Sequence, residues 1–159
     1  MEGVVAGILN PDGTIDEERT AILVNAAAPM NVTFHRAFDM AANQDEALEA
    51  LIYAGCARVL TSGGQQTAPL GIERLADLIK KADNRIAVMP GSGINADNIK
   101  QIAETTGARE LHLSARTFVP GKMTFRQPMV TMGGNFSIPD YDIQLPDKAT
   151  IKKIISMLV

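Results

Sequence analysis

One short segment carries the side chains best suited to chemistry. His35 and Arg36 directly follow the apolar run 32–34, and Asp39 comes three residues after Arg36. An imidazole can act as a general base near neutral pH or bind a soft metal ion. Arg36 can hold a carboxylate or phosphate through two parallel hydrogen bonds, or it can form an ion pair with Asp39 that only shapes the site. The three residues are therefore candidate catalytic groups, for a reaction that the sequence does not specify.

Two turns rich in glycine and serine follow later apolar runs. They are Thr61-Ser62-Gly63 and Gly91-Ser92-Gly93. Glycine lets backbone N–H groups come close to an anion, and the start of a following helix adds partial positive charge. Ser114 and Arg116 follow a further run and can complete an anion-binding site. The alternative is that these glycines only make tight turns.

Soft-metal ligands are few in this chain. It has one cysteine, Cys56, and two histidines, His35 and His112. Methionine sulfur is a good Cu(I) ligand, and Met123 lies in a long segment without helical periodicity. No two of these residues stand at the spacing of a ligand motif. His35, His112 and Met123 are therefore weak metal candidates, and Cys56 is expected to be a small buried apolar side chain.

The candidate residues lie in an alternation of short apolar runs and amphipathic segments. The expected strands cover residues 4–9, 32–35, 58–61, 86–89 and 110–113. A last helix is expected over 151–158, after a long loop over 116–147. Strict β–α alternation indicates an α/β fold with a parallel sheet. About five βα units of roughly 30 residues fit either an open doubly wound sheet or part of a TIM-type (β/α)₈ barrel.

Helix starts can also be predicted. Thr14 with Glu17, and Asn43 with Glu46, have the three-residue spacing of a capping box, in which two side chains satisfy free backbone donors. A further helix is expected to begin near Asn95.

Strand alternation assigns the histidines to a face. Thr33 and His35 share one face of their run, and Glu110, His112 and Ser114 share one face of theirs. Both histidines are then expected to point into a barrel, with His35 near the carboxyl-terminal rim where active sites of this fold lie. The alternative for His35 is a structural hydrogen bond to Glu110 or Thr33.

Composition excludes several classes of protein. The net charge of −3 and the absence of a basic cluster argue against a nucleic-acid partner. No apolar stretch approaches the roughly 18 residues of a membrane-spanning helix. The first residues show no signal-peptide pattern, and a single cysteine fits a reducing compartment. We therefore expect one globular domain in the cytoplasm.

Several blocks together resemble the CutC family, which is named for copper homeostasis. They are Val32-Thr33-Phe34-His35-Arg36-Ala37-Phe38-Asp39-Met40, Arg58-Val59-Leu60-Thr61-Ser62-Gly63, Met89-Pro90-Gly91-Ser92-Gly93-Ile94, Glu110-Leu111-His112-Leu113-Ser114-Ala115-Arg116 and Met123-Thr124-Phe125-Arg126. The resemblance implies a (β/α)₈ barrel and aligns residues 1–159 with its strands 4–8, as a single domain truncated at the N-terminus. The family's proposed copper-binding cysteines belong to the part that has no counterpart here.

Three functional readings follow. The resemblance implies copper homeostasis and copper ion binding, with Cu(I) as the ligand. The alternative is a TIM-barrel enzyme acting on a small anionic metabolite that bears phosphate or carboxylate, and the third is a fragment without function. Because part of a barrel leaves open strand edges, we also expect self-association into a homo-oligomer.

Overall fold

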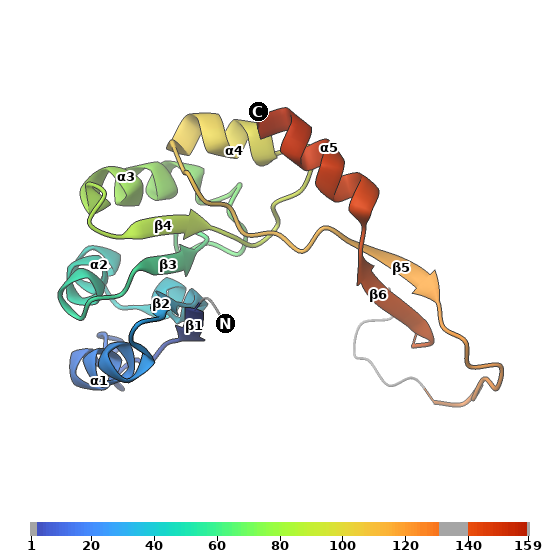
Figure 1. Cartoon of the computed structure of the whole chain (residues 1–159), viewed down its shortest axis with the longest axis horizontal. Helices are drawn as coiled ribbons and strands as arrows, with labels where there is room; N and C mark the ends of the chain where they lie inside the picture. The colour runs from blue at the N-terminus through green and yellow to red at the C-terminus, as the bar shows by residue number, and fades with distance from the viewer. Residues whose placement is uncertain (1–2, 131–139, 159) are drawn as a thin grey trace. The chain divides into compact units, whose positions relative to one another are not determined.

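The structure, a computed structural model, describes residues 3–130 and 140–158. The chain divides into two compact units, one of residues up to Leu113 and one of Ser114–Met157. Each unit is described by itself. The first contains, in chain order, β1 (Gly3–Ala6), α1 (Glu17–Ala27), β2 (Asn31–Phe34), the 3-10 helix η1 (Arg36–Met40), α2 (Gln44–Tyr53), β3 (Arg58–Thr61), α3 (Ile72–Ala82), β4 (Ala87–Pro90) and α4 (Ile99–Thr106) (Figure 1).

The first unit is an α/β fold with a four-stranded parallel sheet. Its strand order is β1-β2-β3-β4, so each strand lies beside the next in the chain without a reversal. The registers pair Val4 with Val32 and Val59 with Val88. An α-helix leads from each strand to the next, which is the crossover that parallel pairing requires.

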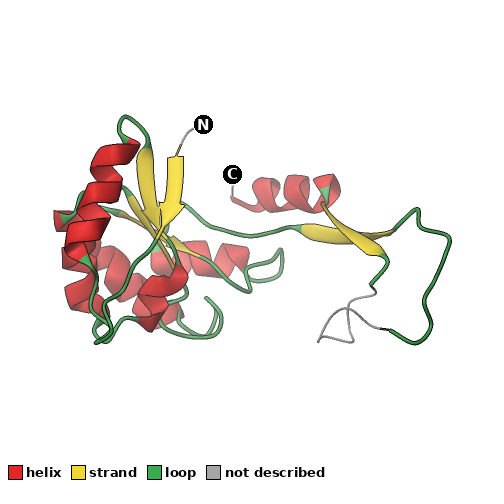
Figure 2. Ribbon diagram, turned by 90° about the horizontal axis from the view of Figure 1, so that it is seen from below, coloured by secondary structure: helices red, strands yellow, loops and turns green. Residues whose placement is uncertain are grey.

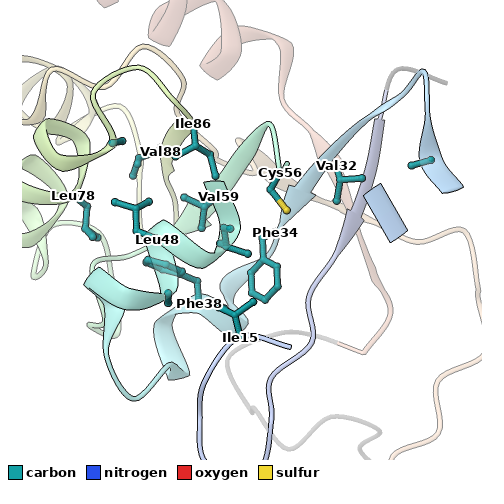
Figure 3. Close-up of a cluster of buried hydrophobic side chains, with 14 residues drawn as sticks. Ile15, Val32, Phe34, Phe38, Leu48, Cys56, Val59, Leu78, Ile86 and Val88 are labelled. Carbon is teal, nitrogen blue, oxygen red and sulfur yellow. The ribbon is translucent and has the colours of Figure 1, made fainter. Parts of the chain in front are cut away.

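The core lies between the sheet and its helices (Figure 3). Phe34 and Val59 of the sheet pack in one cluster with Leu48 of α2 and Leu78 of α3. Each of these side chains is at most 1% exposed, and burial of one such group stabilises the fold by about 2 kcal/mol. Val5, by contrast, is 65% exposed.

The predicted strand positions are confirmed for three of the five runs: 58–61 matches β3 without a shift, and the other two are shifted by one residue. The first run ends at Ala6 rather than at residue 9. The prediction of a fifth strand over 110–113 is wrong, because that segment forms only an isolated parallel bridge between His112 and Gly91. The His112 N–H donates to the Pro90 carbonyl at 2.9 Å. Among the described residues the segment has a partner on one side only, and so no continuous ladder forms.

Of the three predicted helix starts, the one at Asn43 is confirmed and those at Thr14 and Asn95 are wrong. Asn43 caps α2, accepting from the Asp45 N–H at 2.9 Å, and its side chain also bonds Glu46 at 2.8 Å. The prediction for Thr14 is wrong, because Asp16 caps α1. Thr14 instead donates twice to the Asp12 carboxylate, since the preceding turn already engages it.

The third helix start was misplaced as well. The helix expected near Asn95 begins at Ile99, and Asn98 is its N-cap residue. Asn95 accepts from the Asp97 N–H at 2.8 Å, which closes a turn before the helix. The side chain of Asn95 therefore stabilises a turn and does not cap α4.

The second unit contains a two-stranded antiparallel ribbon and a helix. The ribbon pairs β5 (Arg116–Pro120) with β6 (Asp142–Pro146), and α5 (Lys148–Leu158) follows (Figure 2). The prediction of a featureless loop over 116–147 is thus wrong, because the two strands pair across more than twenty intervening residues and local periodicity does not reveal such a pairing. The terminal helix is confirmed and begins three residues earlier than predicted. That the whole chain is one barrel domain stays a prediction.

Candidate functional site

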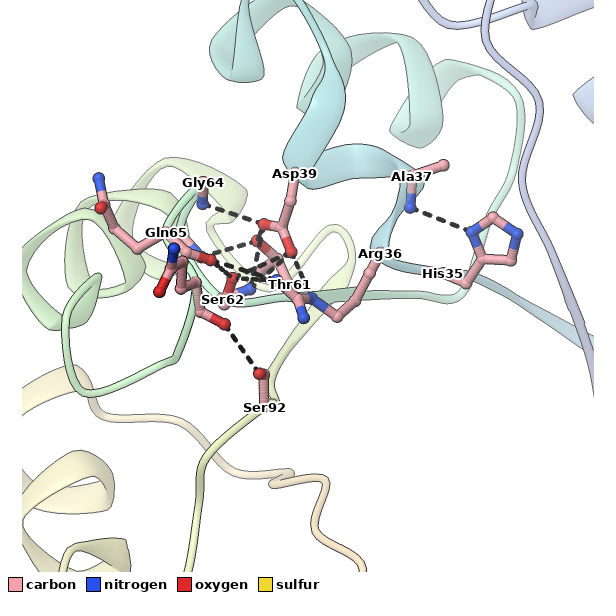
Figure 4. Close-up of polar contacts among 11 residues, drawn as sticks. His35, Arg36, Ala37, Asp39, Thr61, Ser62, Gly64, Gln65 and Ser92 are labelled. Carbon is pink, nitrogen blue, oxygen red and sulfur yellow. Dashed lines mark hydrogen bonds and ion pairs between the residues drawn. The ribbon is translucent and has the colours of Figure 1, made fainter. Parts of the chain in front are cut away.

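The carboxyl ends of β2 and β3 meet around the side chain of Asp39, which η1 places there (Figure 4). Its carboxylate accepts from the Thr61 hydroxyl at 2.5 Å and from the backbone N–H groups of Ser62 and Gly64 at 3.1 and 3.0 Å. Arg36 Nε donates to it at 2.7 Å. The Asp39 side chain is only 6% exposed, so these donors replace its hydration.

The environment of Asp39 keeps it ionised. Burial alone would raise its pKa above the ordinary 3.8, but hydrogen bonds from Thr61, Arg36 and the backbone outweigh burial, and the pKa is lowered. A carboxylate held in this way is a fixed negative charge and a weak base. Of its candidate roles, the structural ion pair with Arg36 is the one that the geometry supports.

The turn Thr61-Ser62-Gly63 binds an anion, but that anion is Asp39. Its hydroxyls and the Ser62 N–H donate to the Asp39 carboxylate, and the N–H of Gly64, the next residue, donates to it as well. The Gly63 N–H donates to the Thr61 hydroxyl at 2.9 Å. The donors that the sequence analysis assigned to an external anion at this turn are therefore engaged within the protein.

Arg36 is held by three partners and keeps part of its guanidinium accessible. Nε binds Asp39, and Nη2 donates to the Ser62 hydroxyl at 2.7 Å and the Gln65 carbonyl at 3.2 Å. Nη1 makes no hydrogen bond within the described part of the chain, and the side chain is 40% exposed. The result is a cation whose orientation is set before any ligand arrives.

His35 is fixed by its own helix cap. Its Nδ1 accepts from the Ala37 N–H at 3.1 Å, and its ring lies against the backbone of Gly7. With the Nδ1 lone pair engaged, the neutral ring carries its proton on Nε2. His35 can thus donate a hydrogen bond from Nε2, whereas base or metal-ligand chemistry there requires the proton to leave. The expected bonds to Glu110 or Thr33 do not form.

The loop after β4 has a strained residue at its centre. Ser92 has a φ of 78°, in the left-handed region that costs most residues energy. Two contacts hold it there, a hydroxyl bond to the Gln66 carbonyl at 2.9 Å and acceptance from the Ala68 N–H at 2.9 Å. The Gly91 N–H is engaged by Thr61. The N–H groups of Ser92 and Gly93 have no partner among the described residues, so they can face an anion.

The remaining candidates are dispersed. Ser114 and Arg116 belong to the second unit, where Arg116 donates to Gln144 at 2.8 Å. Met123 is exposed in that unit, and His112 is exposed beside β4. Cys56 is buried in the core, as expected, and burial raises the pKa of its thiol to about 11.

An ion pair at the sheet was not among the sequence-based predictions. Arg58 of β3 binds both carboxylate oxygens of Glu110, and Arg58 also approaches Thr33. This pairing explains why Glu110 is not the partner of His35. The sequence did carry a signal for this pair. Strand alternation predicted that Thr33 and Glu110 lie on faces that point into the barrel, and a partly buried arginine such as Arg58 needs a nearby carboxylate.

Within residues 3–130 and 140–158, three or more His, Cys, Asp or Glu side chains nowhere gather in a way that could hold a metal ion. No helix in the described ranges is long and apolar enough to span a bilayer.

Comparison with known proteins decides the family. A sequence model of the CutC family matches residues 1–117. The chain belongs to the CutC family. A CutC family protein from Vibrio cholerae is 50% identical over 145 residues, which are 87% of this chain and 57% of that protein. One from Parabacteroides distasonis is 44% identical over 98% of this chain and 64% of its own length.

A solved structure supports the same assignment. The structure from Streptococcus agalactiae, a CutC protein named for copper homeostasis, matches with a TM-score of 0.66 and 30% identity. The match covers 70% of this chain and 55% of that protein. The chain therefore spans less than two thirds of the length of these relatives.

Proposed function

We propose that the rim formed by the ends of β2, β3 and β4 binds a small anionic metabolite that bears a carboxylate or phosphate. The observation that carries this proposal is the orientation of Arg36 by Asp39, Ser62 and Gln65. At the end of a strand, a guanidinium with one nitrogen free of partners can donate to an oxyanion. Because Arg36 is oriented before the ligand arrives, the entropic cost of binding is lower.

Two neighbouring features supply further donors. The loop after β4 leaves the N–H groups of Ser92 and Gly93 without a partner among the described residues, and consecutive free N–H groups of a turn can bind an anion. His35 contributes an N–H at Nε2. In this CutC chain the ligand would be bound by N–H donors alone, and Arg36, whose charge is already paired with Asp39, would add its free Nη1 donor.

The proposal includes a barrel. We propose that β1 to β4 are consecutive strands of a (β/α)₈ barrel, and that the isolated bridge between Gly91 and His112 lies where the barrel continues beyond β4. A strand order without reversal supports this, because an open doubly wound sheet reverses its order at a switch point. Carboxyl-terminal strand ends are the position of active sites in barrels.

Inorganic phosphate and acetate are suitable probes. In amide-resolved NMR titrations, we expect saturable shifts at Ser92 and Gly93 in the native chain. Arg36→Lys keeps the charge but loses the planar guanidinium that Asp39, Ser62 and Gln65 orient, and it should weaken binding roughly tenfold, about 1.4 kcal/mol. Arg19→Lys is the matched control, since Arg19 is an exposed arginine on α1. Shifts that never saturate, or equal affinity in both variants, would refute the site.

Copper binding is the second candidate, favoured by the name of the S. agalactiae relative. Cu(I) prefers two or more soft donors close together. Cys56 is buried with a raised pKa, and the Nδ1 of His35 is engaged. The described residues do not fit a copper centre, so no step is assigned to the metal. In a Cu(I) titration against a competing chelator, we expect the native chain and a His35→Ala, Met123→Ala variant to bind equally weakly.

A further inference from the structure

A groove with acidic walls lies between α1 and α2. It has a volume of about 840 Å³, with apolar groups such as Ile15 and Ala47 in its lining and Glu17, Glu18 and Glu46 among its polar groups. A second hollow of about 610 Å³ shares Glu17 and Glu46 and extends the surface along α2. The two hollows together, called the α1–α2 groove, form one acidic surface with apolar patches.

The charge of the groove is neutralised only in part, because Arg74 and Lys81 pair with Asp45 and Arg85 pairs with Glu49 in the second hollow. Arg19 is the basic residue of its lining, and it pairs with Asp16 at 3.4 Å. Glu17 and Glu18 form no ion pair among the described residues. A surface with fixed excess charge and apolar contacts attracts a partner of the opposite charge.

The same chain carries a segment of opposite character. Residues 111–139 contain Arg116, Lys122 and Arg126 but no aspartate or glutamate, in a chain of net charge −3. Residues 116–130, called the basic arm, also expose Met123, Phe125 and Met129. Basic and apolar side chains are thus interspersed along the arm, where Arg126 also stacks on the ring of Tyr141. This composition complements a groove of acidic walls and apolar lining.

We propose that the basic arm of one copy binds in the α1–α2 groove of a second copy. The basic arm and the acidic groove belong to the same chain. Two copies can therefore each place an arm in the groove of the other and make the same contact twice around a two-fold axis. Binding to a partner would also stabilise the arm, because an isolated two-stranded ribbon such as β5–β6 is at best marginally stable in water. This inference is independent of the anion site.

Charge-altered variants of the whole chain test the contact. The arm variant is Lys122→Glu with Arg126→Glu, and the groove variant is Ile22→Arg, at a groove side chain that is 58% exposed. Leu70→Arg is the matched control, because Leu70 is 68% exposed and lies in neither surface. By sedimentation velocity, we expect the native chain and the control to dimerise, and each variant to associate at least about tenfold more weakly. Added salt should weaken the native dimer.

Mixing and cross-linking identify the partner. The arm variant and the groove variant should associate with each other, because the new glutamates then face the new arginine. Carbodiimide treatment of mixed ¹⁴N- and ¹⁵N-labelled chains should join Lys122 to Glu17 or Glu18 between copies. Cross-links confined to single chains would mean that an arm occupies its own groove, and equal dimerisation of all variants would mean a different interface. Either result overturns the proposal, and neither changes the phosphate titration expected at the rim.

Discussion

At the scale of single residues, the site is organised by a carboxylate that serves the protein itself. Asp39 takes the place that an external anion would have at the turn after β3. It also orients Arg36, whose remaining donor faces outward. In the proposed site the residues of the segment 35–39 therefore differ in role: Asp39 positions Arg36, Arg36 would bind the anion, and His35 would offer one N–H.

The lowered pKa of Asp39 makes a prediction about pH. A carboxyl group whose pKa is lower in the folded state stabilises the fold above its unfolded pKa of 3.8, and that stabilisation is lost as pH falls through the folded value. Asp39→Asn should cost about 3 kcal/mol at neutral pH, because Arg36 and four donors lose their acceptor. Denaturant unfolding from pH 7 to pH 3 should show the two proteins converging under acid. A constant difference across this range would contradict the assignment.

Gly7 is predicted to be required by the ring of His35. A Cβ at Gly7 would lie 2.6 Å from Cε1 and 2.7 Å from Nδ1 of His35, so Gly7→Ala must displace the ring and break its bond to the Ala37 N–H. We expect a loss of about 1–3 kcal/mol and faster hydrogen exchange at the Ala37 amide. The double variant Gly7→Ala, His35→Ala tests the cause, since removal of the ring should make the alanine at position 7 nearly neutral. Additive losses would exclude the ring as the reason.

At the scale of elements, the sheet and helices were largely predictable and their ends were not. Apolar runs near Val32, Val59 and Val88 predicted the strands, because local burial patterns decide where a central strand lies. The segment 110–113 has the same pattern, but within the described part of the chain it has a strand neighbour on one side only. The ribbon β5–β6 was not predicted, because its two strands lie far apart in the sequence and local patterns do not reveal such a pairing. The Arg36–Asp39 pair was foreseen from its spacing, whereas the use of the β3 turn by Asp39 depends on how η1 folds back.

The ion pair of Arg58 with Glu110 is predicted to hold the segment 110–113 beside β4. Arg58 lowers the pKa of Glu110, yet both side chains are partly exposed, so the pair is worth only about 1 kcal/mol. Glu110→Gln should therefore speed hydrogen exchange of the His112 amide, which donates to Pro90, by roughly fivefold. Glu49→Gln is the control, because it breaks a comparable pair with Arg85 elsewhere. Unchanged exchange at His112 in Glu110→Gln would show that backbone pairing alone holds the segment.

At the scale of the whole molecule, membership of the CutC family is shown while activity stays a proposal. The chain matches its relatives over little more than half of their length. In the proposed barrel, the strand that would pair with the free edge of β1 would come from outside the 159 residues. A sheet edge that lacks its neighbour offers unpaired N–H and C=O groups to other chains, and this determines how the isolated chain should behave.

The β1 edge is predicted to drive non-specific aggregation of the isolated chain, separately from any dimer made by the basic arm. Val5 lies on this strand, opposite Thr33, and is 65% exposed. A lysine at an exposed edge position discourages edge-to-edge pairing by repulsion between copies. Val5→Lys should raise the concentration at which light scattering begins by several-fold and leave the unfolding midpoint nearly unchanged, because little buried area is lost at an exposed side chain. Scattering that begins at the same concentration would place the aggregating surface elsewhere, with the exposed apolar residues of the ribbon as the next candidates.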